Sequence, residues 1–224
     1  MAKRFNRTTE KTWKNMKIRK DIITKRFSKF DGRVMFPSSH DIIDKPKIKE
    51  ACFTVLGNLL ASGNDVLITT KPKFSTVKEI IDRFEISRQQ IQFRFTITSK
   101  EDKLLSFWEP NAPEFKERLK SLIYAYKRGF KTSVSSEPFL DYNPKELVEI
   151  VRPFITESLW IGRMNYIPCN GISRKDRPYY EEIRKNYETE HLWDIYNELK
   201  EDPKIRFKDS IKNQLMIPLQ NTTS

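Results

Sequence analysis

The chain has 224 residues, of which 38% are hydrophobic and 32% charged, a composition typical of a globular protein with a heavily charged surface. Its formal net charge of +12 favours contact with a polyanion such as nucleic acid, but the basic residues are spread along the chain, so composition leaves that partner open. No apolar run approaches the roughly 18 residues that a membrane span needs, and no apolar segment follows the basic N-terminus as in a signal peptide. We therefore expect a cytoplasmic protein without a membrane partner.

Helical and strand patterns alternate along the first part of the chain. The spacing of apolar residues predicts helices over residues 9–27, 47–61, 76–84, 113–128 and 144–151. Short β-rich runs between them predict strands over residues 33–36, 65–70, 91–98, 131–136 and 158–164. Strands that alternate with helices pair in parallel through right-handed crossovers. The sequence therefore predicts an α/β fold, either a (β/α) barrel or a doubly wound sheet.

The pattern changes after Tyr166. The remaining residues are rich in charged and aromatic side chains and show two helical stretches, over 177–201 and 208–216, with no strand. We therefore expect two parts, a core over residues 1–166 and a helical C-terminal extension over residues 167–224.

Every predicted strand ends in polar residues. In parallel α/β folds, ligands bind outside the carboxyl ends of the strands. Polar residues in such positions also cap helices and form turns, but five polar ends together favour a binding site. The ends carry Ser38, Ser39, His40 and Asp41; Thr69, Thr70 and Lys71; Thr98, Ser99 and Lys100; Ser135, Ser136 and Glu137; and Arg163 and Asn165.

The third strand has one apolar and one polar face. Alternation places Phe93 and Phe95 on one side and Arg94, Thr96 and Thr98 on the other. A parallel strand buried on both faces is normally almost all apolar, and burying an unpartnered guanidinium is costly. Three explanations remain open: a polar cavity that holds an anionic ligand, a carboxylate partner on a neighbouring strand, or an edge strand with a wet face.

Six short stretches of the sequence resemble one family. FPSSHD, ITTKP, RFTITS, EPNAPEFKERL, SSEPFLD and ESLWIGRMN are similar to the radical S-adenosylmethionine family, most closely to its spore photoproduct lyase-like branch, over about residues 1–166. The resemblance implies a partial barrel of parallel strands. It also implies a [4Fe–4S] cluster that reduces S-adenosylmethionine to release a 5′-deoxyadenosyl radical, here with a nucleic-acid substrate in a lyase or repair reaction.

The resemblance also implies a cofactor site at the strand ends. Ser38, Ser39, His40 and Asp41 would hold the methionyl end of S-adenosylmethionine, and Arg94, Thr96 and Thr98 would line its ribose and carboxylate side. Ser135 and Glu137 would close the far wall with Lys71 between, and Arg163 and Asn165 of the fifth strand end complete the expected set.

One feature departs from the family. The family holds its cluster on a C-x-x-x-C-x-x-C loop after its first strand, and that motif is absent here; the two cysteines, Cys52 and Cys169, stand far apart. We interpret them as reduced thiols of the core. The strand at 33–36 would then be the family's second. The chain would be a fragment lacking its upstream segment, half of a split enzyme whose partner polypeptide carries the loop, or a degenerate barrel with another use.

Two other functions compete with this interpretation. Lysine and arginine in residues 3–33 and 174–212, interleaved with aromatic residues such as Tyr179, Tyr180 and Trp193, would suit a non-catalytic module that binds nucleic acid. The same pattern also describes an ordinary charged helix face. A hydrolase with a metal on His40 and Asp41 is disfavoured, because the chain has only one other histidine, His191.

Overall fold

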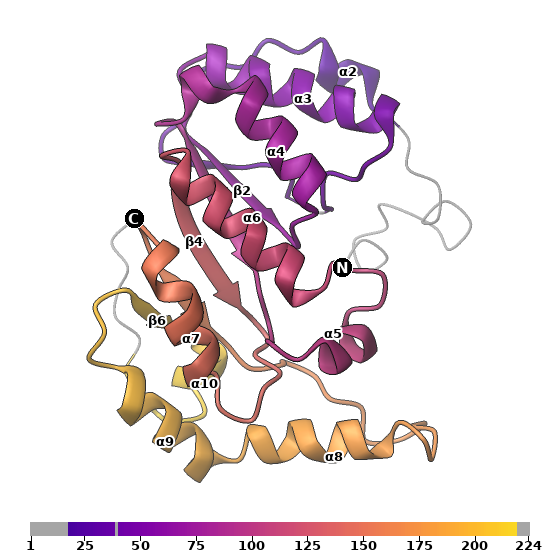
Figure 1. Cartoon of the computed structure of the whole chain (residues 1–224), viewed down its shortest axis with the longest axis vertical. Coiled ribbons are helices and arrows are strands. Elements are labelled where there is room, and N and C mark those ends of the chain that lie inside the picture. The colour runs from indigo at the N-terminus through magenta and orange to yellow at the C-terminus, as the bar shows by residue number, and fades with distance from the viewer. Residues whose placement is uncertain (1–17, 39, 219–224) are drawn as a thin grey trace.

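A computed structural model describes residues 18–38 and 40–218 as one parallel sheet with helices packed on it (Figure 1). The six strands are hydrogen-bonded in the order β1-β2-β3-β4-β5-β6, and every neighbouring pair is parallel. Their bounds are Val34–Met35 (β1), Val66–Thr70 (β2), Ile91–Thr96 (β3), Lys131–Ser136 (β4), Leu159–Ile161 (β5) and Ile205–Phe207 (β6). The five predicted strands are confirmed in order and direction.

The helices connect the strands and extend beyond them. Their bounds are Lys20–Ile23 (α2), Pro46–Ala61 (α3), Phe74–Arg83 (α4), Asp102–Trp108 (α5), Phe115–Lys127 (α6), Lys145–Val151 (α7), Arg177–Asn186 (α8), Thr189–Leu199 (α9) and Asp209–Lys212 (α10). Helix α5 was not predicted. Within the described part of the chain, no helix is both long and apolar enough to cross a membrane.

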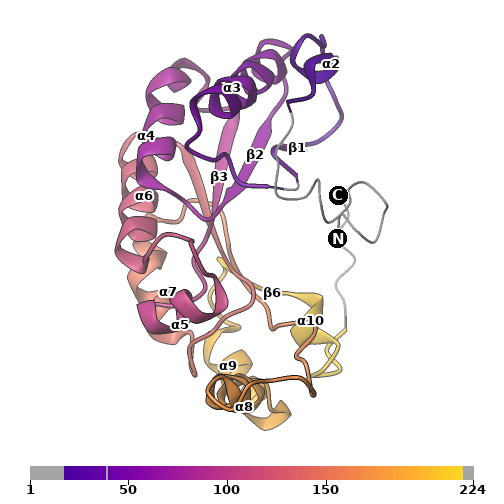
Figure 2. The same cartoon turned by 90° about the vertical axis from the view of Figure 1, so that its right-hand side faces the viewer.

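The strand order decides between the two predicted architectures. A doubly wound sheet reverses its strand order at one point, which sends helices to both faces. Here the order is sequential, so right-handed crossovers place the helices on the same face. Figure 2 shows α3, α4, α6 and α7 along one side of a curved sheet, whose concave side faces away from them. The fold is therefore a partial (β/α) barrel, as the resemblance implied.

Strand β3 shows why the two sides of the sheet differ. Phe93 and Phe95 are fully buried on the helix-covered side, where their rings stack with centroids 5.3 Å apart and Phe130 packs on Phe93. Arg94 and Thr96 alternate with them and point to the other, concave side. Apolar burial therefore orients the strand so that its polar side chains line the open face.

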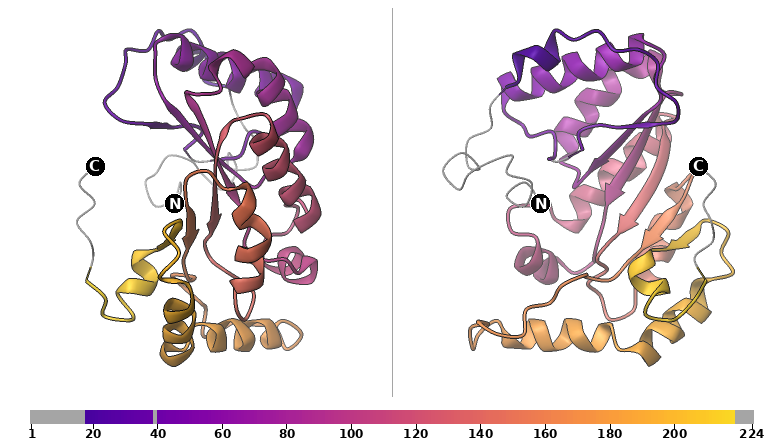
Figure 3. Two further views of the ribbon diagram at one scale, coloured as in Figure 1. Left: turned by 60° about the vertical axis from the view of Figure 1, so that its left-hand side comes forward. Right: turned by 180° about the vertical axis from the view of Figure 1, so that it is seen from behind.

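The part of the chain after residue 166 contains a strand, which corrects the expectation of helices alone. Ile205 and Phe207 are buried and pair in register with Leu159 and Ile161 of β5. The strand was missed because only three residues alternate within a charged stretch. The predicted helix over 177–201 is likewise two helices, α8 and α9, and both lie beyond the carboxyl ends of the strands (Figure 3).

The N-terminal helix is shorter than predicted. Residues 9–17 of the predicted 9–27 range lie outside the described part, and of the remainder only Lys20–Ile23 is helical. Two asparagines of the α3 region hold the following backbone in a non-helical path. The buried Asn64 accepts the amide of Phe30 at 2.8 Å and donates to the carbonyl of Ser28 at 3.0 Å, and Asn58 donates to the carbonyl of Ile23 at 3.0 Å.

The two cysteines have different environments. Cys52 is buried in α3, where burial raises the pKa of its thiol, and this part of the prediction is confirmed. Cys169 is exposed in the segment between β5 and α8, so the prediction of a second core thiol is wrong. Residues 167–176 contain no helix or strand, and their polar sequence leaves Cys169 without an apolar shell.

Candidate functional site

The carboxyl ends of the parallel strands meet at one edge of the sheet, and the first two are tied together there. The carboxylate of Asp41 accepts the hydroxyl of Thr70 at 2.7 Å and the backbone amide of Lys71 at 2.9 Å. Ser38 and His40 are exposed, and the His40 Nδ1 lies 2.9 Å from the carbonyl oxygen of Asp41. Ser39 lies outside the described residues. Asp41 therefore positions the turn after β2.

A buried ion pair supports the end of β3. The Oε2 atom of Glu109 lies 2.6 Å from Nη1 of the fully buried Arg118, and its Oε1 atom lies 3.8 Å from Nζ of Lys71. Arg118 also donates to the carbonyl oxygens of Pro113 at 2.7 Å and Thr96 at 3.3 Å. Glu109 and Arg118 belong to the EPNAPEFKERL stretch that carried the resemblance. Sequence reasoning quoted the stretch but did not assign these two residues to the site, although a glutamate and an arginine framed by prolines were a usable signal.

Arg94 lies on the concave face in the middle of the sheet. Its strand pairs with β2 on one side and β4 on the other, so the explanation of a wet edge strand is wrong. Within residues 18–38 and 40–218 it makes no ion pair closer than 4.0 Å, so the explanation of a neighbouring carboxylate partner is wrong as well. Burial lowers the pKa of Arg94, the charge of Arg33 adds to this, and Glu137 opposes it. The explanation of a polar cavity that holds an anionic ligand stays a prediction.

Several polar atoms on or beside this face are buried without a partner. In the described structure they include Oγ1 of Thr69, Nε of Arg94 and Oγ1 of Thr98. Thr69 and Arg94 are register partners on β2 and β3, so their side chains share the concave face. Thr96 and Ser135 form the next such pair, on β3 and β4. Buried donors without partners are rare in folded proteins, so this face is suited to a polar ligand.

A second group of side chains lies toward β5 and β6. The guanidinium of Arg94 lies 5.4 Å from the ring centroid of Trp160, and Nζ of Lys208 lies 4.9 Å from the same centroid. Lys208 also pairs with Glu137 at 3.1 Å. Of these, Arg94 and Glu137 were predicted and are brought close together. Trp160 and Lys208 were missed, because nothing in the local sequence links β5 to a strand 46 residues later.

Other strand-end residues serve the structure. The buried Asp141 accepts the hydroxyl of Ser99 and the amide of Lys100 (3.2 Å), and burial raises the pKa of this carboxyl while the Ser99 hydrogen bond lowers it. Arg163 donates from Nε to the carbonyl of Ser210 at 2.8 Å, so it anchors α10. Asn165 is exposed. The structure thus places Thr96 and Ser135 side by side on the concave face and brings Glu137 near Arg94. Asp41 and Lys71 meet at the ends of the first two strands, whereas Arg163 contacts α10.

The comparisons with known proteins concern the fold. No family profile and no curated protein sequence matches the chain. Among solved structures, SuiB of Streptococcus suis bound to S-adenosylmethionine is 17% identical with a TM-score of 0.50, covering 73% of this chain and 37% of that one. SuiB in a second structure is 15% identical with a TM-score of 0.51, covering 80% and 41%. A spore photoproduct lyase variant with bound AdoMet and dinucleoside spore photoproduct is 16% identical with a TM-score of 0.44, covering 69% and 45%.

The likeness to the two SuiB structures supports the partial barrel. The chain spans only about two fifths of the length of SuiB. At this level of identity the shared feature is the fold, because unrelated functions recur on one fold.

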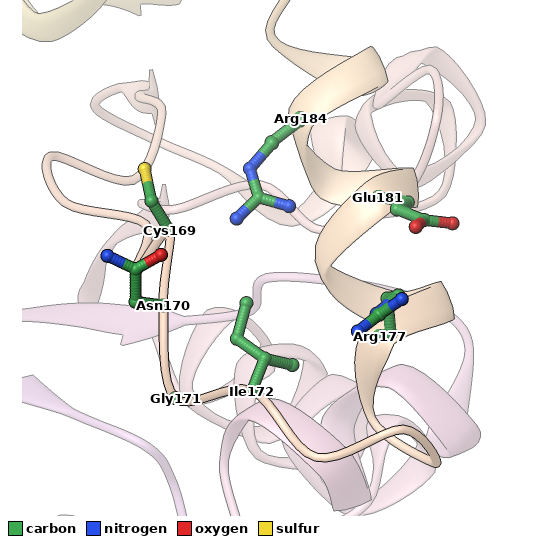
Figure 4. Close-up of a pocket in the computed structure, with 7 residues that line it drawn as sticks. All are labelled: Cys169, Asn170, Gly171, Ile172, Arg177, Glu181 and Arg184. Atoms are coloured by element: carbon green, nitrogen blue, oxygen red, sulfur yellow. The ribbon is translucent and has the colours of Figure 1, made fainter.

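A surface cavity lies apart from the strand ends. It has a volume of about 440 Å³ and lies between the loop 169–172 and the first turns of α8, with Arg177 and Arg184 on the helix side (Figure 4). Arg184 is held by the carbonyl oxygens of Tyr180 and Pro168. None of the predicted site residues lines this cavity.

The thiols of this chain do not fit a [4Fe–4S] cluster. Such clusters are normally held by cysteine thiolates, with at least three from the protein in this family's motif. The chain has two cysteines, one buried inside α3 and one exposed beyond β5. The residues present therefore provide no cluster site.

Proposed function

We propose that this chain binds S-adenosylmethionine at the mouth formed by the carboxyl ends of β1 to β4. The observation that carries the proposal is the set of buried, unpartnered polar atoms on a concave sheet face, including Oγ1 of Thr69 and Nε of Arg94. A fold shared with SuiB, which is bound to S-adenosylmethionine in one structure, supports it.

Each side of the mouth offers chemistry that suits this zwitterionic ligand. Nζ of Lys71 and the half-buried hydroxyl of Thr96 would donate to the methionyl carboxylate. The hydroxyl of Ser135, beside Thr96 on β4, would reach the ribose. Asp41 acts as a positioning residue, because its carboxylate already holds Thr70 and the Lys71 amide.

The finer function implied by the resemblance is a further proposal. Reductive cleavage of S-adenosylmethionine on a nucleic-acid substrate needs cluster thiolates that this sequence does not contain. We propose that another segment or polypeptide contributes them and that the chain alone is inactive. Binding of S-adenosylmethionine at the mouth does not require the iron–sulfur cluster.

Calorimetric titration of the chain with S-adenosylmethionine tests the binding proposal. We expect saturable binding that weakens about tenfold in Lys71→Met, because one charge-assisted hydrogen bond is lost. Lys73→Met is the matched control, since Lys73 lies two residues away with an exposed side chain and pairs with Asp44 at 3.5 Å. A folded chain that shows no binding heat, or equal affinities for the two variants, would contradict the proposal.

The alternative of a non-catalytic nucleic-acid-binding module stays a prediction. Two of its expected stacking residues already have partners: Tyr179 stacks on Phe107 with centroids 3.9 Å apart, and Tyr180 packs edge-on against Trp108 at 4.9 Å. These contacts join α8 to α5 and leave Trp193, 39% exposed, as the more accessible ring. A steep fall of oligonucleotide affinity with salt is the expected sign of such a module.

A further inference from the structure

The concave face carries a compact cationic cluster around one aromatic ring. Arg94 from β3 and Lys208, which follows β6, approach the ring of Trp160 on β5 at 5.4 and 4.9 Å. A tryptophan face stabilises a nearby cation, so the ring holds both charges in place. We call Arg94, Trp160, Lys208 and Glu137 the Trp160 cluster.

The charges of this cluster do not balance. Arg94 and Lys208 contribute two positive charges. Glu137 contributes one negative charge, 3.1 Å from Lys208. Two minus one leaves a net charge of +1, and the positive charge of Arg33 also acts on Arg94. In the part of the chain that the structure describes, neither Arg33 nor Arg94 has an ion-pair partner.

The side chains of Glu137 and Lys208 pack closely against Gly162. A Cβ atom at Gly162 would lie 2.9 Å from Cγ of Glu137 and 3.0 Å from Cγ of Lys208. The glycine at the end of β5 therefore allows both side chains to lie against the sheet. With its Nε buried and unpartnered, Arg94 presents an oriented donor without an acceptor.

S-adenosylmethionine does not complement this charge. Its sulfonium and ammonium outweigh its one carboxylate, so the molecule is a net cation and leaves the positive charge of the cluster uncompensated. A phosphate group carries the opposite charge, and a guanidinium with an ammonium beside it suits phosphate oxygens.

We propose that the Trp160 cluster binds the phosphate group of a second ligand, a phosphomonoester or diphosphate that shares the concave face with S-adenosylmethionine. The inference rests on the proposed function, because the second ligand would be the substrate and would bind at the same mouth as S-adenosylmethionine. Arg94 and Lys208 donate to the phosphate, and Glu137 competes with the phosphate for Lys208.

Titration with pyrophosphate tests the proposal. Lys208→Gln and Arg94→Gln should each weaken binding about tenfold, because each removes one charged donor. Glu137→Gln should strengthen binding about threefold, because it removes the competing carboxylate. Lys175→Gln and Arg174→Gln make the same charge changes at exposed positions and should alter the affinity less than about twofold. Equal effects in the cluster and control variants would overturn the proposal.

The variants also separate this proposal from the first one. Lys208→Gln should leave the affinity for S-adenosylmethionine unchanged, and Lys71→Met should leave that for pyrophosphate unchanged. Pyrophosphate binding without S-adenosylmethionine binding would refute only the proposed function. Binding of a single-stranded oligonucleotide more than about tenfold tighter than pyrophosphate, and sensitive to Lys208→Gln, would assign the cluster to a phosphodiester backbone and overturn the small-ligand proposal.

Discussion

Arg118 is the largest fully buried side chain of the described residues, and it carries a charge. Its carboxylate partner Glu109 is 10% exposed, and the carbonyl oxygens of Pro113 and Thr96 accept two more of its N–H groups. These contacts fix the loop between α5 and α6 against the end of β3. A single buried arginine thus links the most recognisable stretch of the sequence to the candidate site.

Arg118→Met should lower the free energy of unfolding by about 3 kcal/mol, because it leaves the carboxylate of Glu109 buried without its partner. Urea denaturation followed by circular dichroism measures the change. Arg83→Met breaks an exposed pair with Glu50, whose side chains are 44% and 53% exposed, and should have little effect. Equal losses in the two variants would show that the buried pair has no special role.

At the scale of elements, the ends of β4, β5 and β6 pack closely together because Gly162 has no side chain. Gly162 directly follows β5, and the side chains of Glu137 and Lys208 occupy the space that its Cβ would need. Polar contacts join α8 to the segment that follows β4. Asn186 of α8 donates to the carbonyls of Leu140 and Asp141 at 3.1 and 3.2 Å. These contacts help to attach the extension after residue 166 to the strand ends.

Gly162→Ala should lower the free energy of unfolding by about 2 kcal/mol, since two packed side chains must move. It should also weaken pyrophosphate binding by displacing Lys208. Gly57→Ala is the control of opposite sign. Gly57 lies inside α3 and the nearest atom to its Cβ position is 3.7 Å away, so alanine should stabilise by about 0.5–1 kcal/mol. Thermal and urea unfolding of both variants would show whether the signs differ.

At the scale of the whole molecule, the parts before and after residue 166 share one core. The cluster of buried apolar residues runs from Ile42 through the sheet to Ile205, Phe207, Ile211 and Leu215. The boundary at residue 166 stays a prediction. Because β6 pairs with β5 across this boundary, changes to β6 test whether the two parts fold independently.

Phe207→Ala in the full chain should lower the midpoint of a single unfolding transition, because a buried phenylalanine contributes about 3 kcal/mol or more to a core. A chain that ends at residue 166 should lose cooperative unfolding altogether, since β5 then has no partner on one side. Differential scanning calorimetry measures both. Two separate transitions in the variant, or an unchanged midpoint in the shortened chain, would instead establish two independent domains.

Local patterns account for what could be predicted from the sequence. Period-two and period-3.6 spacing of apolar residues predicted five strands and most of the helices, because burial of one face acts on each element separately. Polar strand ends predicted Asp41 and Lys71 at one edge, since parallel strands all end there, and the alternation of the third strand predicted Thr96 on its polar face. The short strand β6 and helix α5 were not predicted, because a few residues carry too weak a periodic signal to be read locally.

The amino-acid sequence by itself determined the class of fold, the direction of its strands and the polar character of the mouth, since each follows from which residues avoid water. Only the tertiary structure decided which charges meet. Arg94 and Lys208 stand more than a hundred residues apart in the chain, and they share the ring of Trp160 because sheet pairing brings β3, β5 and β6 to one concave face. Electrostatic contacts depend on distance in space, which a linear pattern does not contain.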